Sequence, residues 1–235
     1  MDMSDAARKR IAIVAALERE VSPLVKRWRV SGREHEGRRF RFFENDDTVL
    51  VCGGVGFQAA RRAAGAAIIL FQPQIVYSVG FAGALDSGLK VGDIVRPARI
   101  INANDGSRIA VEGGEGVLIS FSAVASPEQK RKLRDSYGAV VVDMEASAVA
   151  QAAEAHGIRF AAIKAVSDEA GFELPPMERF VNPDGSFSEV RFSIFAAMRP
   201  WIWARVVRLA INSKRAARAL CGELEKVNAT QTVNQ

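Results

Sequence analysis

Segments that favour strands alternate with amphipathic or alanine-rich stretches along most of this chain. The segments that favour strands lie at residues 11–16, 39–44, 48–52, 75–79, 91–101, 117–122, 140–142 and 160–166. The helical patterns lie at residues 17–28, 59–71, 127–137 and 146–156. Continuous apolar runs are typical of strands covered on both faces, and helices are the usual cover. The pattern therefore predicts an α/β fold.

Residues 139–171 contain the clearest unit of this kind. A buried strand is expected at 140–142, an alanine-rich helix follows it, and a second buried strand is expected at 160–166. A strand, helix and strand of these lengths predict a crossover with two parallel strands. Glu145 and Asp168, which follow the two strands, would then share the carboxyl edge of the sheet, where α/β folds bind ligands.

Glu145 and Asp168 admit two interpretations from the residues alone. Two carboxyl groups at one edge suit proton transfer, because burial can keep one protonated as a donor while the other stays ionised. Alternatively, both side chains stabilise a helix start or a turn, where acidic residues are favoured for structural reasons. The local pattern leaves both interpretations open.

Length and composition limit the class of protein. The chain has 235 residues, 49% of them hydrophobic and 25% charged, as expected for one globular domain. We expect the domain to span residues 11–226, with a flexible segment at 1–10 and a disordered one at 227–235. The first residues are polar and no run of about 18 apolar residues occurs, which disfavours a signal peptide or a membrane span and favours a cytoplasmic protein.

The net charge of +5 does not by itself indicate a nucleic-acid partner. The basic residues gather in runs, among them 33–41, 130–134 and 199–218, and such runs are most often solvent-exposed faces. No zinc-finger, RNA-recognition or helix-turn-helix pattern accompanies them, so we expect no nucleic-acid binding. The two cysteines, Cys52 and Cys221, form neither a disulfide framework nor a metal-binding pattern.

A glycine-rich turn follows the strand expected at 48–52. Residues 53–59 contain the pattern G-x-G-x-x-A, which also occurs in dinucleotide-binding folds. Such a fold needs an acidic residue at the end of the next strand to hold a ribose hydroxyl. The strand expected at 75–79 is followed instead by the sequence GFAG, so a tight turn beside a ligand explains the glycines better.

Two motifs resemble the signature of the nucleoside phosphorylase/nucleosidase superfamily. They are Asp143-Met144-Glu145-Ala146 and Lys164-Ala165-Val166-Ser167-Asp168. Within the superfamily, the sequence resembles the 5′-methylthioadenosine/S-adenosylhomocysteine nucleosidase branch, and stretches at 16–21, 53–56, 80–85 and 89–95 agree in order and spacing. The resemblance spans roughly residues 10–172. It implies a single-domain three-layer sandwich with a central mixed, largely parallel sheet flanked by helices.

The resemblance also implies roles for the acidic residues. Glu20, in the first turn of its helix, would be the general base that activates the attacking water. Asp168 would be held protonated and would protonate N7 of the departing purine. Glu145 would accept hydrogen bonds from the ribose hydroxyls, with Met144 against the sugar.

Further substrate-binding residues are implied in the same motifs and loops. They are Gly54, Phe81, Ala82, Gly83, Val124, Asp143 and Ser167. Val124 stands where the family often carries an aromatic ring that stacks on the base, and the sequence does not decide whether Phe81, Phe121 or Phe172 replaces it. The resemblance implies no cofactor and no metal, a small-molecule nucleoside as substrate, and a homodimer.

The glycine loops favour hydrolysis over phosphorolysis. Phosphorylases of this superfamily hold phosphate with Arg and Ser in these loops, and the loops at 53–56 and 78–81 have neither residue well placed. Glu20 would also repel phosphate. Lys164 stands where relatives commonly carry Arg, and we expect it to keep a cation near Asp168.

Residues 190–226 form a basic amphipathic tail, predicted as one or two helices interrupted at Pro200. The tail either lies on a membrane surface, as a peripheral contact, or packs on the sheet with a cationic outer face. It also resembles the tail of hopanoid-associated phosphorylases, whose members act on an adenosyl-linked lipid.

Three functions follow from these observations. The first is a purine nucleosidase that hydrolyses 5′-methylthioadenosine or S-adenosylhomocysteine and releases adenine. The second is a nucleosidase or phosphorylase of the hopanoid-associated kind that acts on an adenosyl lipid. The third is a non-catalytic nucleoside-binding module that has kept the fold.

Overall fold

The structure is a computed structural model that describes the backbone of residues 10–233 and the side chains of residues 10–227. The flexible segment predicted at 1–10 therefore lies, except for its last residue, outside the described residues. The disordered segment predicted at 227–235 is described up to residue 233, where it continues the last helix. No helix within the described part of the chain combines the length and apolarity needed to cross a membrane.

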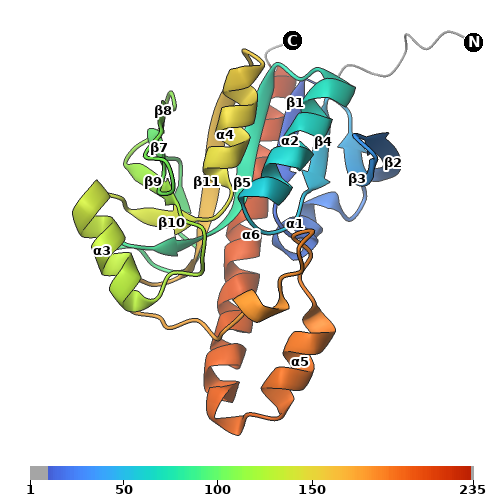
Figure 1. Ribbon diagram of the computed structural model, residues 1–235. Helices are drawn as coiled ribbons and strands as arrows, with labels where there is room; N and C mark the ends of the chain where they lie inside the picture. The colour runs from blue at the N-terminus through green and yellow to red at the C-terminus, as the bar shows by residue number, and fades with distance from the viewer. Residues whose placement is uncertain (1–9, 234–235) are drawn as a thin grey trace, which may run out of the picture.

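Within residues 10–233, eleven strands form one mixed sheet. Nine of them follow the order β2-β3-β4-β1-β5-β10-β9-β7-β8, while β11 pairs with β5, and β6 pairs with β11 (Figure 1). The strands are β1 (Ile11–Ala15), β2 (Arg29–His35), β3 (Arg38–Asn45), β4 (Thr48–Cys52), β5 (Ile75–Ala84), β6 (Ile94–Val95), β7 (Arg99–Asn102), β8 (Arg108–Ala110), β9 (Val117–Ser120), β10 (Val141–Asp143) and β11 (Arg159–Asp168).

Helices cover both faces of this sheet. One face carries α2 (Phe57–Phe71) and α4 (Ala146–Ala155), and the other carries α1 (Glu18–Val25) and α6 (Trp203–Val233) (Figure 1). The remaining helices are α3 (Pro127–Tyr137), α5 (Glu189–Ala197) and the short η1 (Glu178–Phe180) and η2 (Pro200–Ile202). The three-layer α/β architecture predicted for the chain is confirmed.

Strand β1 divides the core because its side chains alternate between the two faces. Ala12 and Val14 pack with α2 and α4, whereas Ile11, Ile13 and Ala15 pack with α1 and α6. Each face therefore has its own apolar cluster, and the central strand is buried on both sides.

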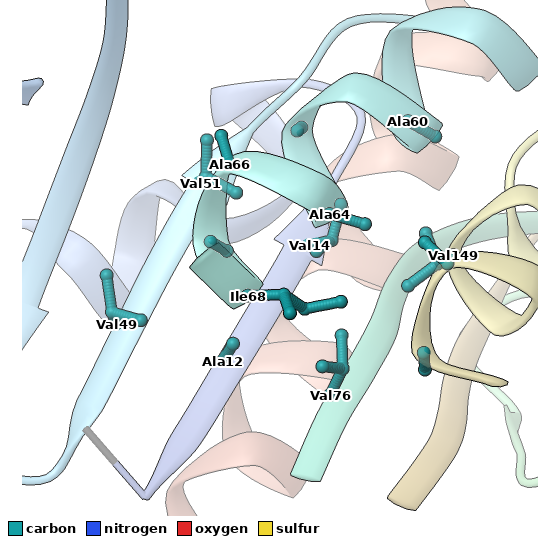
Figure 2. Packing of buried hydrophobic residues seen from close by; sticks show 14 of the residues in the cluster. Ala12, Val14, Val49, Val51, Ala60, Ala64, Ala66, Ile68, Val76 and Val149 are labelled. Carbon is teal, nitrogen blue, oxygen red and sulfur yellow. The ribbon is translucent and has the colours of Figure 1, made fainter. Parts of the chain in front are cut away.

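Small side chains let α2 lie close to the sheet. Ala60 and Ala64 are fully or almost fully buried in the cluster that also contains Val51 and Val76 (Figure 2). Interiors are close-packed, so such contacts leave little room for larger side chains. Alanine is also the best helix former, so the same residues favour α2 locally and at the interface.

The position of the site is set by β5, which has three different partners. β11 pairs with one edge of β5 from residue 75 to residue 83. On the opposite edge, β1 pairs in parallel as far as Ser78, and β10 pairs in antiparallel orientation with Gly83 and Ala84. The carboxyl ends of β1 and β10 therefore face each other across an interval of β5 that neither strand fills.

The prediction that the strands at 140–142 and 160–166 run parallel is wrong. β10 is antiparallel to β5, whereas β11 is parallel to it. The crossover rule assumes that both strands join one sheet in the same sense, but β10 pairs with the far end of β5, beyond the end of β1. The shared location of the two acidic motifs survives this correction, because both strand ends still meet at β5.

Other boundaries also differ from the prediction. The loop expected at 80–85 is largely the second half of β5, and the strand expected at 91–101 is divided into β6 and β7 at Pro97. β2 was not predicted, because it is a polar edge strand without a clear apolar alternation. In contrast, α3 begins after its predicted cap Ser126, whose hydroxyl accepts a hydrogen bond from the Gln129 amide.

Adjacent positions of α2 give a matched test of this packing. We expect Ala64→Leu to lower the free energy of unfolding by about 1–3 kcal/mol, because the added atoms have no space in the buried cluster. Gly65→Ala is the control, since a Cβ there has no neighbour within 4 Å and removes a flexible glycine; it should be neutral or stabilise by up to about 1 kcal/mol. Urea denaturation of both variants checks the difference, and equal stabilities would contradict it.

Candidate active site

A cavity of about 960 Å³ opens where the strand ends meet. Its sheet side is formed by the turns after β1, β9 and β10 and by the ends of β5 and β11, and its helix side by residues 174–192 and α6. The predicted site residues on its wall are Glu20, Phe81, Ala82, Gly83, Val124, Asp143, Met144, Glu145, Ser167 and Asp168. Ten of the eleven predicted residues are thus brought together.

Gly54 is the predicted site residue that does not line this cavity. A Cβ on Gly54 would lie 2.8 Å from the Gly185 carbonyl, so its backbone packs on the segment after η1. The neighbouring Val55 and Gly56 reach the cavity wall instead. The glycine turn therefore contributes to the site through a different residue from the one predicted.

Lys164 of β11 is fully buried and binds the carboxylate of Asp143. Lys164 Nζ lies 2.8 Å from Asp143 Oδ2 and 3.1 Å from Ser78 Oγ. Burial alone lowers the pKa of Lys164, but the charges of Asp143 and Glu145 outweigh burial and raise this pKa above its ordinary value. The buried ammonium group therefore stays charged.

Asp143 has protein partners on both carboxylate oxygens. Its Oδ1 accepts a hydrogen bond from the Ser120 hydroxyl at 2.7 Å, and its Oδ2 accepts one from the Ala146 amide at 2.9 Å, in addition to the contact with Lys164. Asp143 therefore holds the start of α4 and orients Lys164. These contacts indicate an anchoring residue more than the direct substrate contact that the resemblance implies.

Glu145 is held by two backbone amides. The Gly56 amide donates to Oε1 at 2.8 Å, and the Met144 amide donates to Oε2 at 3.2 Å. Burial, followed by the charge of Asp143, raises the pKa of Glu145 to about 7. The side chain is thus fixed in place while its charge remains costly.

Glu20 enters the same region from the first turn of α1. It is buried, and the Leu17 amide donates to its Oε2 at 3.3 Å. Burial raises the pKa of Glu20, an effect that the charge of Lys164 partly opposes. Gly80 of β5 lies directly against it, because a Cβ on Gly80 would be 2.8 Å from Glu20 Oε2. Gly80 also has a φ of +141°, which other residues rarely adopt, so both its conformation and this close approach favour glycine where β5 passes the carboxyl group.

The sheet side of the cavity has more acidic than basic groups. Glu20, Asp143 and Glu145 are all buried near the single ammonium group of Lys164. Crowded buried carboxylates destabilise one another in a medium of low dielectric constant. A ligand that becomes positively charged at this position would relieve that repulsion.

Asp168 has a different cation from the one predicted. Lys130 of α3 lies with its Nζ 2.5 Å from Asp168 Oδ2 and 2.9 Å from the Glu169 carbonyl oxygen. Lys164, which was expected near Asp168, contacts Asp143 and Ser78 instead, and a register irregularity between Val166 and Asp168 interrupts the regular pairing of β11 at this point. The Ser167 hydroxyl donates to the second oxygen of Asp168, Oδ1, at 2.7 Å.

Lys130 is a buried polar residue of the site that the sequence motifs do not predict. It was assigned to an exposed basic run, but only 1% of its surface is exposed. Helical spacing could have indicated that Lys130 is buried. It lies one turn before the apolar Leu133 and therefore shares the buried face of α3. Gly83 gives this pair room, because a Cβ there would lie 2.9 Å from Asp168 Oδ2 and 3.2 Å from Lys130 Cε.

The helix side of the cavity is mainly apolar with a few cations. Phe187 and Phe192 line it, and neither was predicted, because both lie beyond the stretch covered by the resemblance. Of the three rings proposed to replace an aromatic at Val124, Phe81 lines the cavity, whereas Phe121 and Phe172 do not. The basic residues that line the cavity are Arg19 of α1, Lys130 of α3, and Lys214 and Arg218 of α6.

Several known proteins are similar in sequence to this chain. The sequence model of the phosphorylase superfamily matches residues 10–128 and 115–185. A 5′-methylthioadenosine/S-adenosylhomocysteine nucleosidase from Marinomonas sp. (strain MWYL1) is 26% identical over 204 residues, covering 70% of this chain and 88% of that protein. The protein of the same name from Staphylococcus aureus (strain bovine RF122 / ET3-1) is 26% identical over 201 residues. This match covers 69% of this chain and 88% of that protein.

Solved structures share the fold. The nucleosidase of that name from Helicobacter pylori, complexed with a substituted pyrrolidin-3-ol, superimposes with a TM-score of 0.71 at 18% identity and covers 95% of this chain and 99% of that chain. Futalosine hydrolase from the same organism gives a TM-score of 0.65 at 19% identity and covers 93% of this chain and 98% of that chain.

The superfamily match spans more than half of the chain and includes every strand that contributes to the sheet side of the cavity. Both acidic motifs and the glycine turn lie within the matched residues. The chain therefore belongs to the phosphorylase superfamily.

Proposed function

We propose that this protein is a purine nucleosidase that hydrolyses the N-glycosidic bond of 5′-methylthioadenosine or S-adenosylhomocysteine and releases adenine. Membership of the superfamily and similarity to nucleosidases support hydrolysis of an N-glycosidic bond. The observation that carries the proposal is the convergence of Glu20, Glu145 and Asp168 on one cavity. No shared cavity would be needed if these acids only capped helices and turns.

The acidic sheet side suits the sugar. Breaking an N-glycosidic bond leaves positive charge on the ribose, so groups that stabilise this charge accelerate the reaction only if they act in the transition state. Glu145, fixed by two amides, accepts hydrogen bonds from the ribose hydroxyls. The positive charge that develops on the ribose then stabilises the buried carboxyl groups around Lys164.

The pair of Lys130 and Asp168 suits the departing base. Negative charge develops on the ring of the purine as it leaves, and a proton delivered to N7 neutralises this charge. Lys130 donates a hydrogen bond to Asp168, so the ammonium group is the source of a proton that passes through the carboxylate to the base. Asp168 is thus the group in contact with the base, and Lys130 acts through it as a positioning residue.

Water is the favoured nucleophile. Glu20 lies on the acidic side of the cavity, where its carboxylate accepts a proton from an attacking water molecule. The same negative surroundings disfavour a phosphate ion at this position. The cations Arg19, Lys214 and Arg218 also line the cavity, so a phosphate-dependent reaction is the alternative.

A second candidate substrate is an adenosyl compound with a long apolar 5′ substituent. The helix side is lined by apolar side chains, among them Phe187, Phe192, Val206 and Leu209, and lies on the same cavity as the acids. Such a lining favours an apolar chain over a charged one. A homologous series of 5′-alkylthioadenosines tests this candidate, since kcat/KM would rise with chain length if the helix side binds the substituent.

The first prediction concerns Asp168. We expect Asp168→Asn to lower the rate of adenine release from 5′-methylthioadenosine by about 10²–10⁴-fold, the usual contribution of a general acid. Asp135→Asn, at an exposed position of α3, is the control and should retain activity. Chromatography with and without phosphate measures adenine and identifies the sugar product.

Two results would contradict this assignment. Equal rates for the wild type and Asp168→Asn would remove Asp168 as the proton donor. Adenosine binding by the wild type, without adenine release from any adenosyl compound, would favour the non-catalytic module.

The second prediction concerns Lys130. We expect Lys130→Met to lower kcat by about tenfold or more with little change in KM, because Asp168 loses its proton source. Lys130→Arg keeps the positive charge but does not release a proton, so it should not restore kcat, and Lys132→Met, which removes an exposed lysine of the same helix, should leave kcat unchanged. An unchanged or higher kcat in folded Lys130→Met would show that Asp168 acts without it.

The third prediction concerns the charge of Glu145. Because its pKa is raised from 4.5 to about 7, the folded state binds a proton more tightly than the unfolded state, and stability falls as pH rises through this window. The loss is about 3 kcal/mol at most. Glu145→Gln cannot ionise, so its free energy of unfolding should fall less than that of the wild type between about pH 5 and about pH 8. Urea denaturation across this range checks it, and parallel pH profiles would refute the raised pKa.

A further inference from the structure

Exposed apolar side chains are concentrated in one part of the molecule. Among the described residues, nine large hydrophobic side chains are exposed, and seven of them lie between residues 190 and 211. They are Val190, Ile194, Met198, Trp201, Trp203, Val207 and Ile211. Isolated exposed hydrophobic residues are common, but a contiguous set on one element usually marks a binding surface.

These side chains follow a regular spacing on two helices. Val190, Ile194 and Met198 recur every four residues along α5, and Trp203, Val207 and Ile211 do the same along the start of α6. Residues four apart lie on the same face of a helix. Trp201, whose exposed fraction is 72%, lies in η2 between the two stripes.

The two helices form a hairpin that projects away from the sheet. Figure 1 shows α5 and the first turns of α6 below the rest of the molecule, joined by a turn at the far end. We call residues 189–211 the α5–α6 hairpin. The turn carries the most exposed tryptophan, so the tip of the projection is apolar.

Core packing does not account for the exposed stripes. Phe192 and Phe195 pack with Phe180 in an aromatic cluster, and Val206 and Leu209 line the cavity. The inner faces of both helices therefore already have their partners within the chain. The outer stripes are a separate feature that the proposed nucleosidase reaction does not use.

The charge of this region identifies its partner. The α5–α6 hairpin contains four Arg residues and one Glu, a net charge of +3. Arg205 and Arg208 contact Glu173 and Glu169, whereas Arg191 and Arg199 have no ion pair among the described residues. A second copy of this chain would bring two such surfaces face to face, and like charges would repel.

An anionic lipid surface matches both properties. Amphipathic helices bind membranes by burying an apolar face at the level of the headgroups while Lys and Arg contact anionic lipids. Tryptophan favours this interface because its ring is largely apolar and its N–H is polar. The guanidinium group of Arg199 stacks on Phe195, 3.9 Å from the ring centroid, which places a cation beside the apolar tip.

We propose that the α5–α6 hairpin docks this protein on the surface of anionic membranes, with Trp201 and the two apolar stripes in the headgroup region. α6 connects this surface to the reaction site, because its residues Val206, Leu209 and Ala210 line the helix side of the cavity. Docking therefore brings the cavity close to the bilayer. The proposal does not depend on the nucleosidase reaction and is tested without it.

The test is co-sedimentation of the full chain with vesicles of phosphatidylcholine, with and without phosphatidylglycerol. We expect binding to the mixed vesicles that weakens at high salt, together with a blue shift of tryptophan fluorescence. The double variant Trp201→Ser/Ile194→Ser should lower the partition coefficient about tenfold or more, because it removes two apolar side chains from the interface. Ile69→Ser, an equally exposed change on α2, is the matched control and should bind like the wild type.

Circular dichroism shows whether the double variant keeps the native fold, and Trp201→Ser alone replaces it if folding is lost. Equal binding of the wild type and a folded variant, or no binding of the wild type to either vesicle, would overturn the proposal. Dimerisation that the double variant abolishes, without vesicle binding, would overturn it in favour of a contact between two copies. Light scattering distinguishes that last outcome.

Discussion

The site depends on one interval of β5 that has a partner on only one side. β1 ends its pairing at Ser78, and β10 begins at Gly83 from the opposite direction, so two strand ends face each other beside the middle of β5. The chain must therefore leave the sheet after β1 and after β10. Glu20 and Glu145 lie in the segments that follow these two strand ends. Glycine makes this possible, because a side chain at residue 80 would occupy the space of the Glu20 carboxyl group.

The electrostatics of the site follow from this crowding. Three carboxyl groups share one buried ammonium group, and burial raises the pKa of Glu20 and Glu145. Burying a charged group costs desolvation free energy unless an opposite charge offsets it. Here the single ammonium group of Lys164 offsets only part of the cost of the three carboxylates. Functional sites commonly carry such local instability, and the rest of the core supports it. The proposed cationic sugar would supply the missing positive charge at the moment of reaction.

Different parts of the C-terminal helix α6 contribute to three surfaces with different roles. Its second half covers the sheet through Ala216, Leu220 and Leu224, its middle lines the cavity, and its first turns belong to the α5–α6 hairpin. From its sequence alone, the C-terminal tail could either contact a membrane or pack on the sheet. The structure assigns packing on the sheet to the second half of α6, and the proposal assigns membrane docking to the start, because the helix extends past the edge of the sheet.

Local sequence determined much of the fold and the composition of the sheet side. Helices α2, α3 and α4 follow from alanine content, capping and periodicity, which act between residues close in the chain. The acidic motifs placed the carboxyl groups of the sheet side, because a family resemblance records residues together with their spacing. Ser126 even marked the first turn of α3 correctly.

Tertiary structure alone decided which groups meet. The direction of β10, the edge strand β2, the pairing of Lys130 with Asp168 and the phenylalanines of the helix side all depend on contacts between residues far apart in the chain. Periodicity reports which face of an element is buried, but it carries no information on what lies opposite that face. The role of Lys130, on the buried face of α3, becomes evident only when folding places the carboxylate of Asp168 within hydrogen-bond distance.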